Sequence, residues 1–481
     1  MRNLAIVFLL LVAGLAGCAS QGPDDTNQAA HDEAAVYDAI EQRIGTPLTD
    51  DGFESDAPAV NLERLYALTG PSERTPGVAE GFIETAVKDG YAYLCRSGTD
   101  EGLVIFDIHD IEAPKYVSSI RLDAGFEADI EVSDDGNWAF WETQRIPGFG
   151  IPDATDPTSL PGATPYGIHI IDISDKANPR WAGFTPVAPN GPHSITYANI
   201  GGEDYVFASV YSWQYVGTSV TPVRLAPPGL QRLVIYQLDT SGPVAQLTEV
   251  STYIDEDALG ESVVPADEMM PHDVSISVHP FTNKTYAYVA YWNLGVVIVD
   301  VTDPAQPTKV GAAADFGLAP TKEIHMARQS ERPIDGKVIV VAEPEIAGQE
   351  TTGYMSVIDV SDPANPAFVS NWKIPGNATS GGGGRGPHYF DFRDGRVVLA
   401  SYSAGFWVFD IHHAANLARP RTVAYAAVPA GGGLFGGTAF DAWWADPTHI
   451  VGSESSNGLV VFRYDGPTPV IDGLATAADA A

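Results

Sequence analysis

The stretch Gly295–Pro307, GVVIVDVTDPAQP, decides the fold of this chain. A short run of β-branched residues ends in Asp300, and a turn sequence with Asp-Pro and a second proline follows it. A short apolar run bounded by Gly and Pro is typical of a buried strand that leads into a tight turn. The same phrase returns elsewhere in the chain, clearly at Gly102–Pro114, Gly167–Pro179 and Tyr354–Pro366, and in weaker form at Arg232–Pro243, Gly405–Asp410 and Gly458–Arg463.

The spacing of these seven copies predicts a repeat fold. The position of Asp300 recurs at intervals of 51 to 65 residues, which is close to the length of a propeller blade with its loops. We therefore predict an all-β fold, a seven-bladed β-propeller of four-stranded antiparallel blades around a channel. The seventh blade lacks a clear outer strand, whereas Arg64–Leu68 precedes the first blade. We expect this N-terminal strand to complete the last blade and close the ring, which removes an open sheet edge.

The N-terminus has the features of an exported lipoprotein. Residues 1–17 contain one Arg, an apolar core and small residues at the end, which predicts a signal peptide. Leu15–Cys18, LAGC, resembles a bacterial lipobox, and the resemblance implies cleavage before Cys18 and lipidation of its thiol. An ordinary signal peptide with a chance cysteine is the alternative. Ala19 stands where an Asp would imply inner-membrane retention, so we expect an outer-membrane lipoprotein with a periplasmic or cell-surface orientation.

Composition separates the remaining chain into three parts. Residues 18–60 are acidic and poor in aromatic residues, so we expect a lipidated tether with one helix over Ala29–Gln42. The propeller is expected over residues 61–466, and a C-terminal tail over 467–481. The net charge is −36, from 62 acidic and 26 basic residues. This excess of acid argues against nucleic acid as a partner and restricts membrane contact to the lipid anchor.

At this point the repeated phrase resembles a known family. GLVIFDIHDIEAP, GVVIVDVTDPAQP and MSVIDVSDPANP are similar to the repeat of the LVIVD-repeat β-propeller family. The resemblance covers roughly residues 61–464 and implies the fold and a secreted or surface-attached protein, but no catalytic residues. The Asp-rich turns lack the interleaved carboxylates and the Gly of a calcium loop. We therefore expect their Asp side chains to hydrogen-bond the turn backbone.

Histidines supply the candidate chemistry. His193, His272 and His388 each follow a proline and directly precede the first strand of a blade. Blade five has Lys322 at this position, with His325 three residues later. Because first strands line the axis of a propeller, these side chains are expected to face one another at the channel mouth. They would suit one ion of zinc, copper or iron; the alternative is that they only hydrogen-bond loop backbone.

A second candidate site is a loop-rich face on the same rim as the histidines. Two long loops, residues 144–167 and 212–231, connect the second and third strands of blades two and three. Long ordered loops are commonly functional. An insertion without a role is the alternative. The side chains expected on this binding face are Arg145, Phe149, Tyr166, Trp213, Tyr215 and Arg224.

Two functions follow from these sites. The first hypothesis is a cell-envelope lipoprotein whose propeller is a binding or scaffold module for a protein or glycan, through the loop-rich face. The alternative is a metal-dependent enzyme, resembling an oxidoreductase, with the histidine cluster at the channel mouth. A propeller fold by itself does not choose between them, and the sequence leaves open whether the protein is an enzyme.

Overall fold

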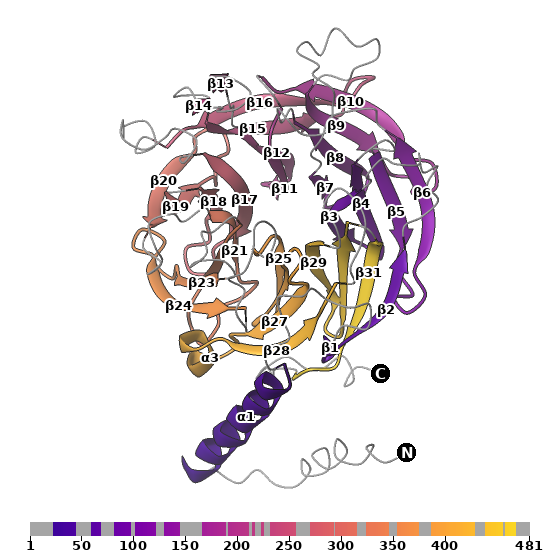
Figure 1. The fold of residues 1–481 in the computed structure, drawn as a ribbon. Helices are drawn as coiled ribbons and strands as arrows, with labels where there is room; N and C mark the ends of the chain where they lie inside the picture. Colours follow the sequence, from indigo (N-terminus) through magenta and orange to yellow (C-terminus); the bar gives the residue numbers. More distant parts are fainter. Residues whose placement is uncertain are drawn as a thin grey trace.

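Seven antiparallel sheets stand around a common axis in the computed structural model of this chain (Figure 1). In each sheet the strands follow one another from the axis to the rim, so that the predicted seven-bladed β-propeller is confirmed. The structure describes residues 23–44, 59–68, 81–97, 102–121, 129–144, 166–188, 191–210, 214–216, 223–225, 231–255, 270–292, 294–314, 324–345, 354–374, 386–428, 438–455 and 457–467.

The first four blades each consist of four strands, and a separate hairpin extends from the third. From axis to rim, blade one has β3 (Gly81–Lys88), β4 (Tyr91–Ser97), β5 (Gly102–Asp107) and β6 (Lys115–Arg121), and blade two has β7 (Ile130–Val132), β8 (Trp138–Thr143), β9 (Gly167–Asp172) and β10 (Arg180–Pro186). Blade three has β11 (Ser194–Ile200), β12 (Glu203–Val210), β15 (Arg232–Asp239) and β16 (Gln246–Tyr253), with the hairpin β13 (Gln214–Val216) and β14 (Val223–Leu225). Blade four has β17 (Pro271–Val278), β18 (Thr285–Tyr291), β19 (Gly295–Asp300) and β20 (Thr308–Ala313).

The last three blades follow the same order, and two N-terminal strands join them. Blade five has β21 (Ile324–Gln329), β22 (Ile339–Pro344), β23 (Tyr354–Asp359) and β24 (Ala367–Lys373); blade six has β25 (Phe390–Arg393), β26 (Arg396–Ala400), β27 (Phe406–Asp410) and β28 (Arg421–Ala426), with β1 (Ala59–Val60) on its edge and the short helix α3 (Ala414–Ala418) between β27 and β28; blade seven has β29 (Ala439–Asp446), β30 (His449–Glu454), β31 (Gly458–Tyr464) and β2 (Leu62–Leu68).

Strand β2 closes the ring, as the sequence predicted. It pairs antiparallel with β31, from Leu62 opposite Tyr464 to Leu68 opposite Leu459. The outer edge of blade seven is therefore covered by a strand from the other end of the chain. This pairing joins the two ends of the propeller within blade seven and covers the strand edge that β31 would otherwise expose.

The repeated phrase folds as its composition demands. Gly295 opens β19 with a φ of 94°, and a Cβ at this position would lie 2.1 Å from the carbonyl oxygen of Ala313. Asp300 ends the strand, and its Oδ1 accepts a hydrogen bond of 3.0 Å from the backbone N–H of Thr302. The Asp side chains thus hold the turns, as expected, and the same bond to the residue two positions later recurs at Asp107, Asp172, Asp239, Asp359 and Asp410.

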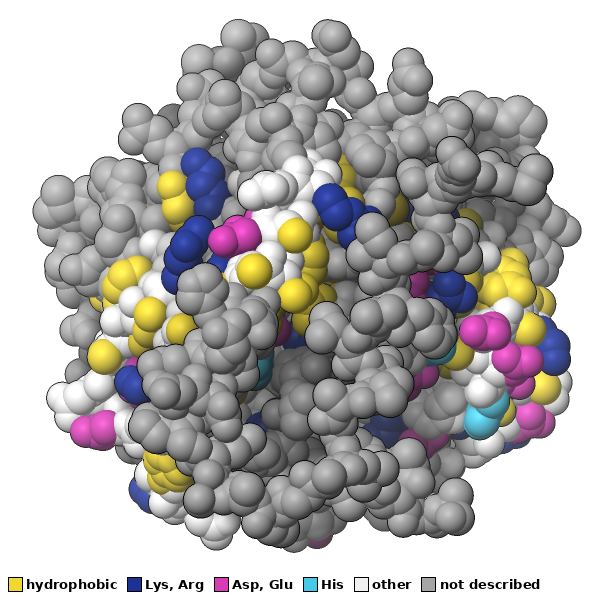
Figure 2. Space-filling model, turned by 90° about the horizontal axis from the view of Figure 1, so that it is seen from below, with side chains coloured by type: hydrophobic (Ala, Val, Ile, Leu, Met, Phe, Trp, Pro, Cys, Tyr) yellow, Lys and Arg dark blue, Asp and Glu magenta, His cyan; other side chains and the backbone are white. Residues whose placement is uncertain are grey.

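The core lies between neighbouring blades. One cluster joins blades one and two through Tyr93, Ile105, Trp141 and Ile171, each at most 1% exposed. Face-to-face packing of adjacent blades is the source of stability in this repeat architecture. Figure 2 shows acidic and basic side chains interspersed on the described part of the surface in that view.

Helix α1 (Pro23–Ile44) precedes the propeller and packs on blade six (Figure 1). Tyr37, Ile40 and Ile44 are buried, and their spacing forms an apolar stripe along one side of the helix. Among the described residues, no helix is long and apolar enough to cross a membrane. The expected helix over Ala29–Gln42 is thus present, but it is longer at both ends.

Polar contacts fix the helix to blade six. The hydroxyl of Tyr37 donates to Asp410 Oδ2 at 2.8 Å. Arg421 forms ion pairs with Asp38 at 2.5 Å and with Glu41 at 2.9 Å. The helical part of the segment expected to be a tether is therefore docked on the propeller.

Candidate metal centre

Four consecutive blades each place one histidine at the same point near the axis. His193 directly precedes β11 and His388 lies two residues before β25, whereas His272 and His325 are the second residues of β17 and β21. The strand register shifts around His272 and around His325, so both residues are β-bulges. A bulge re-aims a side chain and is frequent beside functional sites.

Blade five requires a correction to the sequence alignment. The histidine position of this blade was assigned to Lys322, which lies outside the described residues, with His325 three residues later. The structure places His325 itself in register with His272. Blade five has Ile324 where blades three, four and six have proline, so the Pro-His pattern failed to identify the position.

The four imidazole rings form a continuous row. Ring centroids lie 4.2 Å apart for His193 and His272, 4.2 Å for His272 and His325, and 4.5 Å for His325 and His388. The Nε2 atoms of His193 and His272 are 2.8 Å apart. The structure therefore brings together all four of the histidines that the sequence singled out.

Three of the rings are oriented by oxygen acceptors at Nδ1. The Nδ1–H group of His193 donates to Gln144 Oε1 at 2.8 Å, and that of His388 donates to the carbonyl oxygen of Phe440 at 2.8 Å. His325 Nδ1 donates to Glu343 Oε1 at 2.6 Å. Metal-binding histidines almost always donate their second ring N–H group in this way. The arrangement turns Nε2 of each ring toward the row.

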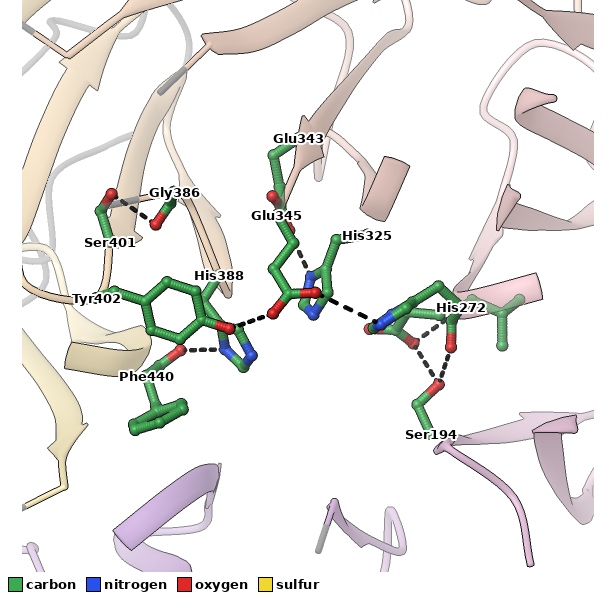
Figure 3. A network of polar contacts seen from close by, with 12 residues as sticks. Ser194, His272, His325, Glu343, Glu345, Gly386, His388, Ser401, Tyr402 and Phe440 are labelled. Carbon is green, nitrogen blue, oxygen red and sulfur yellow. Dashed lines mark hydrogen bonds and ion pairs between the residues drawn. The ribbon is translucent and has the colours of Figure 1, made fainter. Parts of the chain in front are cut away.

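Glu345 adds a carboxylate to the histidines (Figure 3). Its Oε2 atom lies 3.8 Å from His272 Nε2. One ligand atom each from His272, His325 and Glu345 lie within 4.8 Å of one another. Glu345 directly follows β22, the strand that also carries Glu343, so the adjacent strand of blade five supplies both acids. These three residues are the set with which the structure could hold a metal ion.

Burial favours the neutral form of two of the histidines, His272 and His388. It lowers the pKa of His272 well below its ordinary value, and the neighbouring His325, His193 and His388 lower it further. Burial, then the charge of His325, lowers the pKa of His388 in the same direction. Neutral imidazole is the form that binds metals. Burial, followed by the charge of Glu345, raises the pKa of Glu343 well above the usual range.

Tyr402 contacts Glu345 from blade six and has an unusual backbone. Its hydroxyl donates to Glu345 Oε1, and its ring centroid lies 4.9 Å from that of His388. Tyr402 has a φ of 35°, in the left-handed region that bulky residues seldom adopt. Such a conformation costs about 1–3 kcal/mol and often marks a functional site.

A layer of carboxylic acids lies next to the histidines at the first strands of the blades. Asp273 directly follows His272 on β17, Glu84 and Asp441 lie on β3 and β29, and Asp129 directly precedes β7. Burial raises the pKa of Asp273 to about 7, with a further rise from Asp129, and burial raises that of Asp441 to about 7. Burial and then Asp129 raise the pKa of Glu84 well above the ordinary value. An ionised carboxylate in this layer raises the pKa of its buried neighbours, because like charges close together away from water repel one another.

The loop-rich face lies mostly outside the described residues. This is the case for Arg145, Phe149 and Trp213, and the signal peptide and Cys18 are also outside. Tyr215 and Arg224 are paired in the backbone register of the β13–β14 hairpin, and Tyr166 is half-buried beside β9. The binding face remains a prediction.

Sequence reasoning missed the partners of the histidines. Gln144, Glu343, Glu345 and Tyr402 all come from or just after the second strands of blades two, five and six. The signal was the pair of acids in Glu343-Pro344-Glu345 at the end of an otherwise apolar strand.

Three stretches of the chain match a known family of repeats. Residues 165–184, 283–315 and 350–373 match the LVIVD repeat. The chain carries LVIVD repeats. Each matched stretch contains the third strand of a blade, β9, β19 or β23, and the resemblance drawn from the repeated phrase is confirmed.

Solved structures were also compared with the chain. The β-propeller domain of Cps50 (Swd1) from Myceliophteria thermophila has 9% identity and a TM-score of 0.48, with 80% of this chain and 99% of that one covered. Sqt1 from Saccharomyces cerevisiae has 10% identity and a TM-score of 0.48, over 84% and 88%. The WD40 β-propeller domain of Doa1 has 8% identity and a TM-score of 0.48, over 84% and 97%. No curated protein matches the chain.

Proposed function

We propose that this protein is a metal-binding β-propeller that holds one transition-metal ion in the row of histidines. The observation that carries the proposal is the convergence of ligand atoms from His272, His325 and Glu345 within 4.8 Å. Nitrogen ligands of one tetrahedral zinc ion, at about 2.0–2.1 Å from it, lie about 3.4 Å from each other. Side-chain rotations that move the ligand atoms by about an ångström would therefore form a binding site.

The donor set defines the class of metal. Imidazole suits zinc, copper and iron, whereas soft sulfur ligands favour copper(I). A set of two or more imidazoles and one carboxylate therefore favours zinc or iron(II). His193 and His388, at the two ends of the row, are available to complete the coordination. Metal-dependent catalysis, with redox chemistry if iron or copper is the ion, is the activity that such a centre supports.

Metal analysis of the purified protein tests the proposal. We expect about one zinc, copper or iron ion per chain, and we expect H325A to lose it. The exposed His109, which pairs with Asp107 on the surface, provides the control variant H109A, which should keep the ion. Added metal should raise the stability of the metal-free wild type, by about 4 kcal/mol at 1,000 times the dissociation constant. Wild-type protein without bound metal and without such a gain would disprove the proposal.

We further propose that the propeller is displayed in the cell envelope. Lipidation of Cys18 and an outer-membrane location are supported by the first 19 residues of the sequence. A protein or glycan partner at the loop-rich face is supported by the β13–β14 hairpin, which sets Tyr215 beside Arg224. Cross-linking in intact cells should capture that partner with the wild type and not after replacement of residues 214–225 by a short Gly-Ser loop; equal capture would reject this face.

A further inference from the structure

The carboxylate of Glu345 lies between two groups from different blades (Figure 3). Its Oε1 atom accepts the hydrogen bond from Tyr402 of blade six, whereas its Oε2 atom points to His272 Nε2 of blade four at 3.8 Å. The Glu345 side chain is 15% exposed, compared with 4% for His272. Glu345 is therefore the ligand in this set with the most access to water, and one hydrogen bond decides where it points.

The turn that carries Tyr402 is held firmly. The backbone N–H of Ala404 donates to the carbonyl oxygen of Ser401 at 2.7 Å, and that of Ala439 in blade seven donates to the carbonyl oxygen of Tyr402 at 3.0 Å. The hydroxyl of Ser401 donates to the carbonyl oxygen of Gly386 at 2.9 Å. These bonds keep the backbone of Tyr402 in its left-handed conformation.

A left-handed turn position does not itself require tyrosine. Glycine or asparagine adopts a positive φ at much lower cost. The presence of a large phenol at a φ of 35° therefore needs a reason in the side chain. The side chain reaches Glu345 and packs beside His388, so its contacts lie in the candidate metal centre.

We propose that Tyr402 is the positioning residue that makes Glu345 a monodentate ligand of the ion. This inference rests on the metal centre proposed above. By holding Oε1, the phenol leaves only Oε2 to face the imidazoles. It also keeps the carboxylate from turning toward solvent. Without the phenol, both oxygens become available and Glu345 gains rotational freedom, so the ion loses affinity and its coordination changes.

A double-mutant cycle with cobalt(II) and zinc(II) tests the proposal. The variants are Y402F, E345Q and the double variant, and the control is Y389F, which removes a phenol that lies beside His325 and His388 without contact to Glu345. We expect Y402F to lower zinc affinity by about 10–100-fold, as loss of groups that orient ligands does. E345Q should lower it at least as far, and the double variant no further, because Tyr402 acts through Glu345. The visible spectrum of bound cobalt(II) should change in Y402F and stay unchanged in Y389F.

The outcomes separate this inference from the metal centre itself. If the wild type binds zinc and Y402F binds it with the same affinity and cobalt spectrum, the role of Tyr402 is rejected and the metal centre stands. Additive losses in the double variant also reject it. If the wild type binds neither metal, the proposal of a metal centre is rejected, and the role of Tyr402 is rejected with it. If Y402F fails to fold, E345D provides the second measurement: it keeps the phenol and the charge but withdraws Oε2, and wild-type affinity in E345D would overturn the proposal.

Discussion

Replacement of Leu62 by alanine measures how much the closing strand stabilises the propeller. Leu62 is 2% exposed and packs in the cluster between blades six and seven, with Val423 and Phe462 among its members. Tyr66, four residues later on β2, is 36% exposed. The two residues share a strand and a partner strand and differ in burial, so Y66A is a matched control for L62A.

The expected magnitude follows from burial and from the cavity that the shorter side chain leaves. Loss of a fully buried leucine side chain costs about 2–5 kcal/mol, depending on how far its neighbours relax. Surface substitutions usually change stability by about 0.5 kcal/mol or less. We therefore expect L62A to lower the free energy of unfolding by about 3 kcal/mol, and Y66A to change it by less than about 1 kcal/mol, allowing for the partial burial of Tyr66.

Urea unfolding followed by tryptophan fluorescence provides the measurement. Both variants and the wild type are unfolded in the presence of a chelator, so that no metal adds to stability. L62A should shift the midpoint to lower urea with an unchanged slope, because the native state stays compact. Equal and small shifts for L62A and Y66A would show that β2 does not complete blade seven, and the account of ring closure would then be wrong.

Two further predictions concern pH and the anchor. As the pH falls from about 8 to about 6.5, Asp273 and Asp441 should add to the free energy of unfolding of the metal-free protein, because burial raises their pKa values to about 7 and the folded state takes up protons that the unfolded chain does not. The lowered pKa values of His272 and His388 act in the opposite direction, so urea midpoints of the wild type are compared with those of D441N across this range; the same change of midpoint with pH in both proteins would contradict the raised pKa of Asp441. C18S should leave the protein unlipidated and soluble after export; detergent partitioning of the variant equal to that of the wild type would show that Cys18 is not the anchor.

Most of the fold could be predicted because one strand repeats. The third strand of each blade is buried on both faces, so it must be continuously apolar, and in the clear copies, such as Gly295–Pro307, a turn with Asp and Pro follows it. The docking of α1 could not be predicted in the same way. Its attachment depends on Arg421 and Asp410, which are more than 370 residues away in sequence, and no local pattern announces such a contact.

The histidines of the candidate site could be predicted from the sequence, but their partners could not. Histidines after proline recur at blade starts, so their convergence follows from the symmetry of the ring. Glu343, Glu345 and Tyr402 come from loops and strand ends of differing length, and their approach to the histidines depends on β-bulges that shift the register by one residue. The position of His325 was misassigned because Ile324 replaces the proline that precedes the other three histidines.

The closing strand has a consequence for the order in which the protein is made. Strand β2 leaves the ribosome among the first parts of the chain, whereas its partner β31 is synthesised almost 400 residues later. Six blades can assemble without the C-terminal end of the chain, but the seventh is complete only when that end pairs with β2. Such distant pairings fold slowly and expose strand edges in the meantime. A chain that stops short of blade seven would therefore keep an unpaired N-terminal strand and an open ring. The quality-control machinery of the cell would then encounter exposed strand edges.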